Sequence, residues 1–303
     1  MKKVLVLYYS QTGQLKRVLE SFTTQLPDEE IRVEYRAIEP TELYPFPWSF
    51  YEFFDEFPEA VLESGCDIKP IENLEDDYDL IILGYTVWYM APSVPVTAFM
   101  HSQEAKKLFR GKPVVTVVAC RDMWVLAQEK LKNMLEGLGA RVIDHVALTD
   151  QGGSVKSLVS LPVWMLTGDK NYFVSLPKAG ISEETIEGCS RFGKRLGEEL
   201  KKDSEKQAQA MLRNLGACEV NGKLIATEKI ANRSFQVWSR LIKASGEKHS
   251  FGRKVSITVY VTFLLALIFT VIPLNILARK VLNRFQKEKI LVMEAEYELP
   301  SGR

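Results

Sequence analysis

The chain has 303 residues and balanced charge, with 39 lysines and arginines against 39 aspartates and glutamates. This balance favours neither nucleic acid nor a strongly acidic partner. Because the four cysteines are far apart and there are only three histidines, we expect neither a disulfide framework nor a metal site.

Apolar strand candidates alternate with helix candidates through the first two thirds of the chain. The predicted strands are 3–9, 31–37, 79–84, 113–119 and 141–148. The predicted helices are 14–25, 94–109, 124–138 and 183–202. Such alternation indicates an α/β protein whose parallel sheet carries helices on both faces.

A polar turn, Ser10-Gln11-Thr12-Gly13-Gln14, joins the first predicted strand to the first helix. A helix N-terminus offers unpaired N–H groups and the positive end of its dipole, so such a turn can bind an anion. Ser10 and Thr12 add hydroxyl donors, and Gly13 lets the backbone approach the anion closely. The spacing matches neither the nucleoside-triphosphate loop nor G-x-G-x-x-G. It predicts a site for a single phosphate group.

Two segments are longer than this sheet needs, and both are predicted inserts. Residues 40–77 contain Pro45-Phe46-Pro47-Trp48, and residues 150–180 contain an apolar patch at 158–166. Long loops in compact domains are commonly functional or disordered, and the aromatic content argues against disorder. The inserts therefore either cover the sheet or form a wall around an apolar ligand.

The C-terminal third contains a charge-free run at 255–278 that is long enough to cross a bilayer. We expect 253–303 to be a membrane-anchoring helix with a basic tail. Pro273, Asn275 and basic residues on both sides leave spanning and re-entrant arrangements open. Residues 203–252 are predicted to be an amphipathic connector with helices at 208–215 and 235–242. The N-terminus lacks a secretory signal, which predicts the cytoplasmic face of the inner membrane.

The phosphate-type turn and two later strand-end loops together resemble flavodoxin-like proteins. The resemblance covers residues 1–202. It implies a doubly wound five-stranded parallel sheet in the order 2-1-3-4-5, with FMN at the carboxyl ends of the strands. The chain departs from the family at Leu15, where a hydroxyl residue is usual.

The resemblance also assigns the cofactor-binding residues. Trp88 and Tyr89 would stack on the flavin ring, and Arg121 would stabilise the reduced flavin with its charge. The full predicted set is Ser10, Gln11, Thr12, Gly13, Gln14, Leu15, Thr86, Val87, Trp88, Tyr89, Cys120, Arg121 and Trp124.

The opening phrase VLYYSQTGQL, the long insert and the C-terminal membrane segment resemble a narrower family, the flavodoxin-like aromatases of bacterial dialkylresorcinol biosynthesis. In that family a ketosynthase partner makes a dialkylcyclohexane-1,3-dione, which the aromatase oxidises to a resorcinol. The resemblance implies an FMN-dependent oxidoreductase that removes a hydride equivalent and a proton. Asp122, Tyr89 and Asp150 are the candidate catalytic bases.

The predicted partners are a lipophilic substrate, inner-membrane lipid, a ketosynthase and a second copy of the chain. Two other functions remain open. One is a flavin-dependent quinone or porphyrinogen oxidoreductase, which the membrane segment fits equally well. The other is a membrane-tethered electron carrier, although such carriers usually present an acidic docking face.

Overall fold

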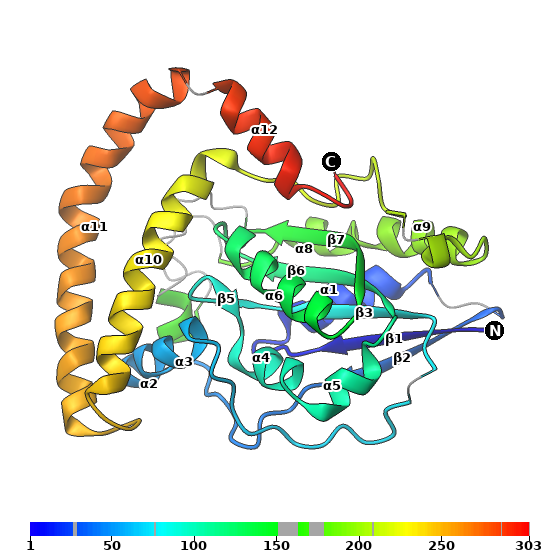
Figure 1. Ribbon diagram of the computed structural model, residues 1–303, viewed down its shortest axis with the longest axis horizontal. Coiled ribbons are helices and arrows are strands. Elements are labelled where there is room, and N and C mark those ends of the chain that lie inside the picture. Colours follow the sequence, from blue (N-terminus) through cyan, green and yellow to red (C-terminus); the bar gives the residue numbers. More distant parts are fainter. Residues whose placement is uncertain are drawn as a thin grey trace.

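The computed structural model describes residues 1–26, 29–75, 77–150, 163–169, 179–207, 209–285 and 287–302, with side chains described except at 271–285, 287 and 289. A five-stranded parallel sheet forms its centre (Figure 1). The strands are β1 (Lys2–Tyr8), β2 (Ile31–Ala37), β3 (Leu80–Tyr85), β6 (Pro113–Cys120) and β7 (Arg141–Thr149).

The strands lie side by side as β2-β1-β3-β6-β7. Numbered within this sheet alone, that order is the predicted 2-1-3-4-5. The difference from the prediction is a separate antiparallel hairpin of β4 (Val87–Trp88) and β5 (Ala91–Pro92). The hairpin occupies the predicted ring-contacting loop after β3, so this loop has a fixed backbone pairing.

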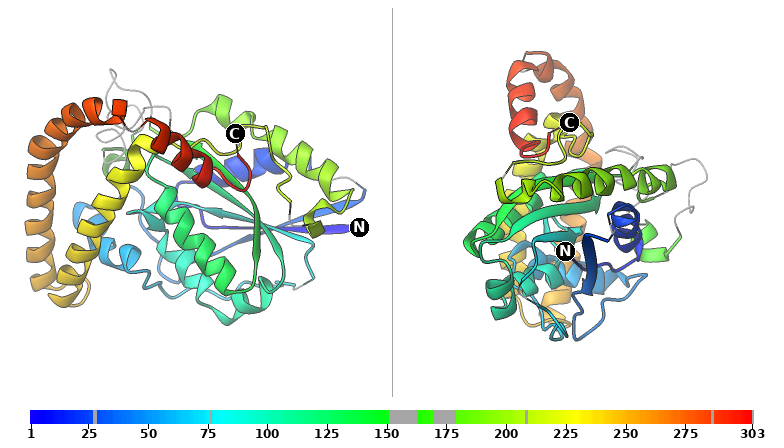
Figure 2. Two further views of the ribbon diagram at one scale, coloured as in Figure 1. Left: turned by 45° about the horizontal axis from the view of Figure 1, so that its top comes forward. Right: turned by 90° about the vertical axis from the view of Figure 1, so that its right-hand side faces the viewer.

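Helices cover both faces of the sheet, as predicted (Figure 2). Helix α1 (Gln14–Thr23) packs against α8 (Glu183–Glu187) and α9 (Ser190–Leu200) on one face. The opposite face carries apolar residues of α4 (Val94–Met100), α5 (Gln103–Leu108) and α6 (Val125–Gly137). Two hydrophobic cores therefore flank one nearly fully buried sheet.

Two predicted helices are each broken in two. The helix predicted at 94–109 breaks after Met100, and Ser102 caps α5 by accepting a hydrogen bond from the backbone N–H of Ala105. The helix predicted at 183–202 breaks at Gly188, between α8 and α9. A side-chain cap accounts for the first break only, because Cys189 at the start of α9 makes no capping hydrogen bond.

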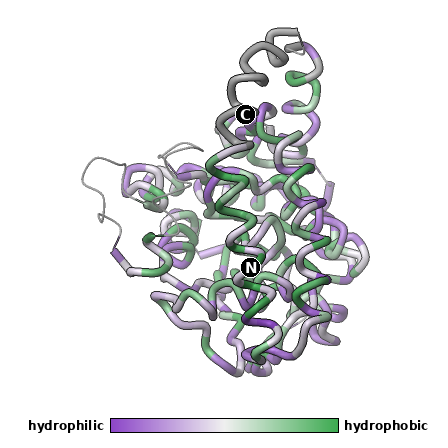
Figure 3. The backbone as a smooth tube through the Cα atoms, turned by 90° about the vertical axis from the view of Figure 1, so that its left-hand side faces the viewer, coloured by the Kyte–Doolittle hydropathy of each residue, from purple (hydrophilic) through white to green (hydrophobic). Residues whose placement is uncertain are grey.

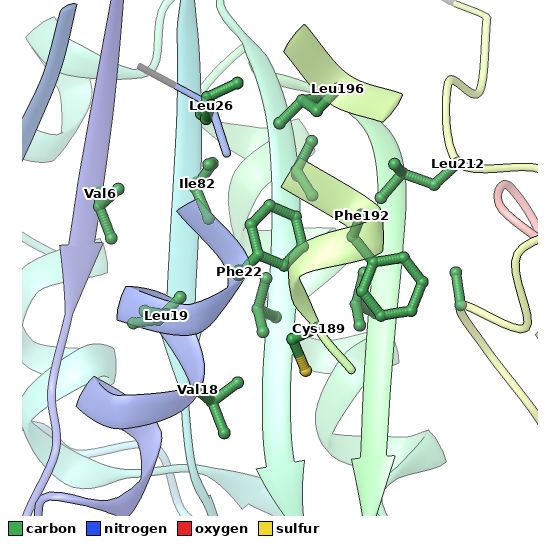
Figure 4. Packing of buried hydrophobic residues seen from close by; sticks show 14 of the residues in the cluster. Val6, Val18, Leu19, Phe22, Leu26, Ile82, Cys189, Phe192, Leu196 and Leu212 are labelled. Carbon is green, nitrogen blue, oxygen red and sulfur yellow. The ribbon is translucent and has the colours of Figure 1, made fainter. Parts of the chain in front are cut away.

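Close packing of α1 against α9 depends on a glycine. Figure 4 shows Phe22 of α1 beside Phe192 of α9, with ring centroids 5.9 Å apart. At the neighbouring Gly193, an added Cβ would lie only 1.8 Å from the Phe22 carbonyl oxygen. Real Cβ atoms never approach backbone oxygen so closely, so only glycine permits this helix contact.

The insert at 40–77 contains α2 (Phe50–Asp55) and α3 (Phe57–Val61). Ser49 caps α2 in a reciprocal capping box with Glu52. Of the second insert, residues 151–162 and 170–178 lie outside the described residues, including most of the apolar patch predicted at 158–166.

The predicted connector is only partly helical. Residues 209–215, within the helix predicted at 208–215, form turns, whereas 235–242 lies within α10 (Gly222–Ala244) as predicted. The buried carboxylate of Asp144 in β7 accepts the backbone N–H groups of Met211 and Leu212, at 2.7 and 3.2 Å. Because Asp144 accepts these backbone N–H groups, they do not need the hydrogen bonds of a helix.

The C-terminal third returns to the sheet. Helix α11 (Phe251–Phe285) runs beside α10 and arches over to α12 (Lys287–Tyr297) in Figure 1. Beyond α12, Ser301 donates to Asp144 at 2.8 Å and accepts the His145 backbone N–H at 2.7 Å. The segment predicted to be a basic tail is therefore built into the α/β unit at its end.

Candidate functional site

A cavity of about 330 Å³ lies at the carboxyl ends of β1, β3 and β6, where the strand order reverses. This is where ligands bind in doubly wound sheets. All but two of the sequence-predicted site residues line it. Those that do are Ser10, Gln11, Thr12, Gln14, Leu15, Thr86, Val87, Trp88, Tyr89, Cys120, Arg121, Asp122 and Asp150.

The turn before α1 has the geometry of an anion site. Gly13 adopts φ 78° at the N-cap position, and the Ser10 hydroxyl accepts the Lys16 backbone N–H at 3.3 Å. The N–H groups that precede it in the first turn of α1 have no intrahelical partner and are available to an anion. Gln11 fixes this turn to the insert by donating to the Pro45 carbonyl at 2.8 Å.

An aromatic wall stands beside the turn. Trp88 makes edge contacts with Tyr9, Tyr44 and Trp48, at centroid distances of 6.0, 4.9 and 5.6 Å. Trp48 comes from the insert, and its backbone N–H donates to the Met165 carbonyl at 2.8 Å. The predicted stacking residue Trp88 is thus held by residues from both inserts.

Tyr89 lines the cavity but is a poor candidate base. Its hydroxyl donates to the Phe53 carbonyl, and its ring packs against Phe57 at 5.1 Å. Burial raises its pKa well above the ordinary value of 10.0. The phenol therefore stays neutral, with its proton committed to the backbone.

A cluster of charged side chains also lines the cavity. Burial lowers the pKa of Arg121, and the carboxylates of Asp122 and Asp150 oppose that shift. Arginine remains charged even so, because its ordinary pKa is far above neutrality. Asp150 also accepts the Gly180 backbone N–H at 2.8 Å. Both aspartates therefore balance the charge of Arg121 beside the cavity.

Trp124 lies elsewhere than predicted. It is almost fully buried, packs against His145 at 5.0 Å and belongs to a cluster with Val220 and Ile225 of the C-terminal third. It immediately precedes α6, and its ring fills the interior between that helix and α10. The predicted cofactor contact is replaced by a core contact that the local sequence does not reveal.

Several cavity residues were absent from the sequence prediction. The insert supplies Trp48, Phe53 and Glu56, and α10 supplies Phe235. The only sequence signal for these residues was the aromatic content of the insert, which suggested a wall around an apolar ligand. Among the described residues, three buried side-chain atoms of the cavity have no hydrogen-bond partner, namely Trp48 Nε1, Glu56 Oε2 and Thr86 Oγ1.

The sheet order and the cavity define a flavodoxin-like α/β protein with a ligand pocket at the carboxyl edge of its sheet. No protein-family model matches the chain, and no curated protein shows significant similarity to it.

Solved structures of similar fold are flavoproteins and flavodoxins. One is a flavoprotein in complex with FMN from Lactobacillus acidophilus NCFM, with a TM-score of 0.40 and 21% identity over 48% of this chain and 93% of that one. A putative flavoprotein from Bacteroides eggerthii DSM 20697 gives 0.37 and 20%, over 49% and 89%. Oxidised flavodoxin 1 from Bacillus cereus gives 0.34 and 17%, over 63% and 95%.

Proposed function

We propose that the pocket binds FMN and that the protein is an FMN-dependent oxidoreductase. The N-terminus of α1 and the turn before it supply a phosphate site, and Trp88 supplies an aromatic face. The observation that carries the proposal is Thr86 Oγ1, a buried pocket hydroxyl without a partner among the described residues. A polar edge of a bound ring would satisfy it.

The proposed substrate is a dialkylcyclohexane-1,3-dione, which the protein oxidises to a dialkylresorcinol. The reaction removes two hydrogens from the ring, one as a proton beside a carbonyl and one as a hydride from the neighbouring carbon. When bound, FMN supplies the two-electron acceptor for the hydride. The sequence resemblance supports this substrate. The aromatic side chains of the insert also suit a hydrophobic ring with alkyl chains.

The chain's own residues prepare this chemistry. Trp48, Phe53 and Phe235 line the cavity with apolar surface, against which a hydrophobic ring can pack. Arg121 places a positive charge beside the ligand, where negative charge develops as the ring loses its proton. The aromatic lining from the insert favours an enzyme with a substrate of its own over an electron carrier, which needs only an exposed flavin edge.

The deciding experiment is turnover of a synthetic dialkylcyclohexane-1,3-dione by the purified full chain loaded with FMN. We expect a product two hydrogen atoms lighter, with the mass and retention of the resorcinol. Reduction of quinones without dione turnover would instead favour the quinone oxidoreductase. A protein that only exchanges electrons with partner proteins would be a carrier.

Cofactor identity can be tested through two threonines. Mass spectrometry of the extracted cofactor should give FMN rather than FAD. Thr86→Val should raise the free energy of unfolding of the apoprotein by about 1 kcal/mol, because it removes a buried unpaired hydroxyl, and should weaken FMN binding about fivefold. The exposed Thr12 differs, since Thr12→Val should cost about 1.5–3 kcal/mol of FMN binding without changing apoprotein stability.

Fluorescence titration with FMN and urea unfolding of the apoproteins measure both quantities. Unchanged FMN affinity in both variants would place the cofactor elsewhere. Loss of apoprotein stability in Thr86→Val would show that the hydroxyl has a structural partner.

We also propose that α10 and α11 rest on a membrane surface. Among the described residues, one helix, beginning with residues 251–270, is long and apolar enough to cross a bilayer, and only 22% of its apolar window is buried. Its outward face exposes Val255, Val259, Leu265 and Phe269. Figure 3 looks onto this side of the molecule and shows the hydrophobic run along α11.

Both ends of this segment hold the same α/β unit, which favours a helix lying in the interface over one that crosses. At the start of α11, Arg253 is bound to Asp55 and Glu59. After α12, Ser301 donates to Asp144 of β7 at 2.8 Å. A single crossing would place these two attachments on opposite sides of the bilayer.

Flotation with anionic liposomes tests this arrangement. Val259→Glu combined with Phe269→Glu should abolish flotation, because two charges would enter the apolar region. Leu43→Glu, at an equally exposed apolar residue in the insert, should float like the parent. An epitope added after Arg303 should remain open to protease outside sealed vesicles, and its protection would show a crossing helix.

A further inference from the structure

Glu56 is a buried carboxylate in the cavity wall, at the junction of α2 and α3. The residue is 9% exposed. Its Oε1 atom accepts a hydrogen bond from Lys248 Nζ at 2.5 Å. Its Oε2 atom has no hydrogen-bond partner among the described residues. One oxygen is therefore held by a cation while the other is left without a proton donor.

An unpaired buried carboxylate oxygen is costly to maintain, since the desolvation of that oxygen is not repaid. Burial raises the pKa of Glu56 above its ordinary value of 4.5, whereas Lys248 lowers it. A carboxyl with a raised pKa binds a proton more readily than an exposed one. Such a group is a stronger proton acceptor than an exposed carboxylate.

The other titratable groups around Glu56 are too weakly acidic to compete for this role or are paired with cations. Asp55 and Glu59 raise its pKa further and are themselves bound to Arg253. The remaining neighbours are neutral thiol and phenol groups, whose own pKa values burial raises, namely Tyr9, Tyr44, Cys66 and Tyr89.

We propose that Glu56 is the proton acceptor of this pocket. The proposal rests on the proposed oxidation of a cyclic dione. A ring C–H bond beside a carbonyl breaks, its electron pair moves onto the carbonyl oxygen to give an enolate, and the proton bonds to Glu56 Oε2. Lys248 stabilises the carboxylate before the transfer. Asp122 and Asp150 instead interact with the positive charge of Arg121.

The position of Lys248 connects this step to the membrane-facing helices. The residue lies in the turn between α10 and α11, so the turn holds the carboxylate in its charged form. The ion pair between Glu56 and Lys248 therefore links the proposed base to the helices that we propose rest on the membrane.

Glu56→Gln tests the assignment in the full chain loaded with FMN. We expect kcat on the dione to fall about 100-fold or more, with FMN affinity unchanged. Glu63→Gln is the matched control, because Glu63 is also a part-buried carboxylate bound to a lysine, Lys130 at 2.9 Å, but lies outside the cavity lining. That control should keep the parental kcat.

The pH profile separates a catalytic role from a structural one. Since the base acts when deprotonated, kcat/KM of the parent should fall as the pH drops through the raised pKa of Glu56. Lys248→Met removes the cation that lowers this pKa, so the acid limb of kcat/KM should move to higher pH. This variant remains informative even where Glu56→Gln fails to fold.

The failures of the two proposals can be told apart. A parent protein that leaves the dione unchanged contradicts the proposed function. A parent that turns over the dione, with Glu56→Gln equally active or with the acid limb unmoved in Lys248→Met, contradicts the role of Glu56 alone.

Discussion

Arg253→Met is expected to lower the free energy of unfolding by about 3–5 kcal/mol, the usual cost of removing one partner from a buried ion pair. The Arg253 side chain is 2% exposed. It donates to the carboxylates of Asp55 and Glu59 and to the Asp55 carbonyl. Methionine keeps much of the volume but leaves two buried carboxylates without their countercharge.

The next residue along the chain is the matched control. Lys254 is exposed, and its ammonium lies 6.0 Å from the ring centroid of Tyr51. Lys254→Met should therefore change stability by about 1 kcal/mol or less. Urea unfolding of both variants in one detergent compares them. Similar midpoints for the two would show that Arg253 does not anchor α11.

Gly193→Ala is expected to destabilise the protein by about 3 kcal/mol or more, as an over-packed helix contact. The added methyl group would meet the Phe22 carbonyl oxygen at 1.8 Å, so α1 and α9 must separate. Since α1 also carries the anion-binding turn, FMN affinity should fall together with stability.

Gly197 provides the comparison one turn further along α9. A Cβ there would meet its nearest neighbour, Leu26 Cδ1, at 3.6 Å, which is an ordinary contact. Gly197→Ala should be neutral or stabilise by up to about 1 kcal/mol through helix propensity. Thermal unfolding monitored by circular dichroism measures both variants. Equal stability of the two would mean that the helices separate at little cost.

The sheet and the edge that carries the pocket can both be predicted from local sequence patterns. The buried apolar run 113–119 in β6 and the alternating run 31–37 in β2 are local patterns. Each strand can therefore be predicted from its own residues. Once the strands are parallel, the loops after β1, β3 and β6 must meet at one edge. That rule brought Thr12, Trp88 and Arg121 together without knowledge of any contact.

The side chains that line the pocket and the position of the C-terminal third depend instead on contacts between distant segments. Phe235 and Glu56 reach the same cavity from segments far apart in the chain, and no local periodicity records such a meeting. Arg253 and Lys254 look alike in sequence as a basic flank, yet one is buried and the other exposed. Asp55 and Glu59 cause this difference. A charged side chain can be buried only where charges of opposite sign compensate for its loss of hydration.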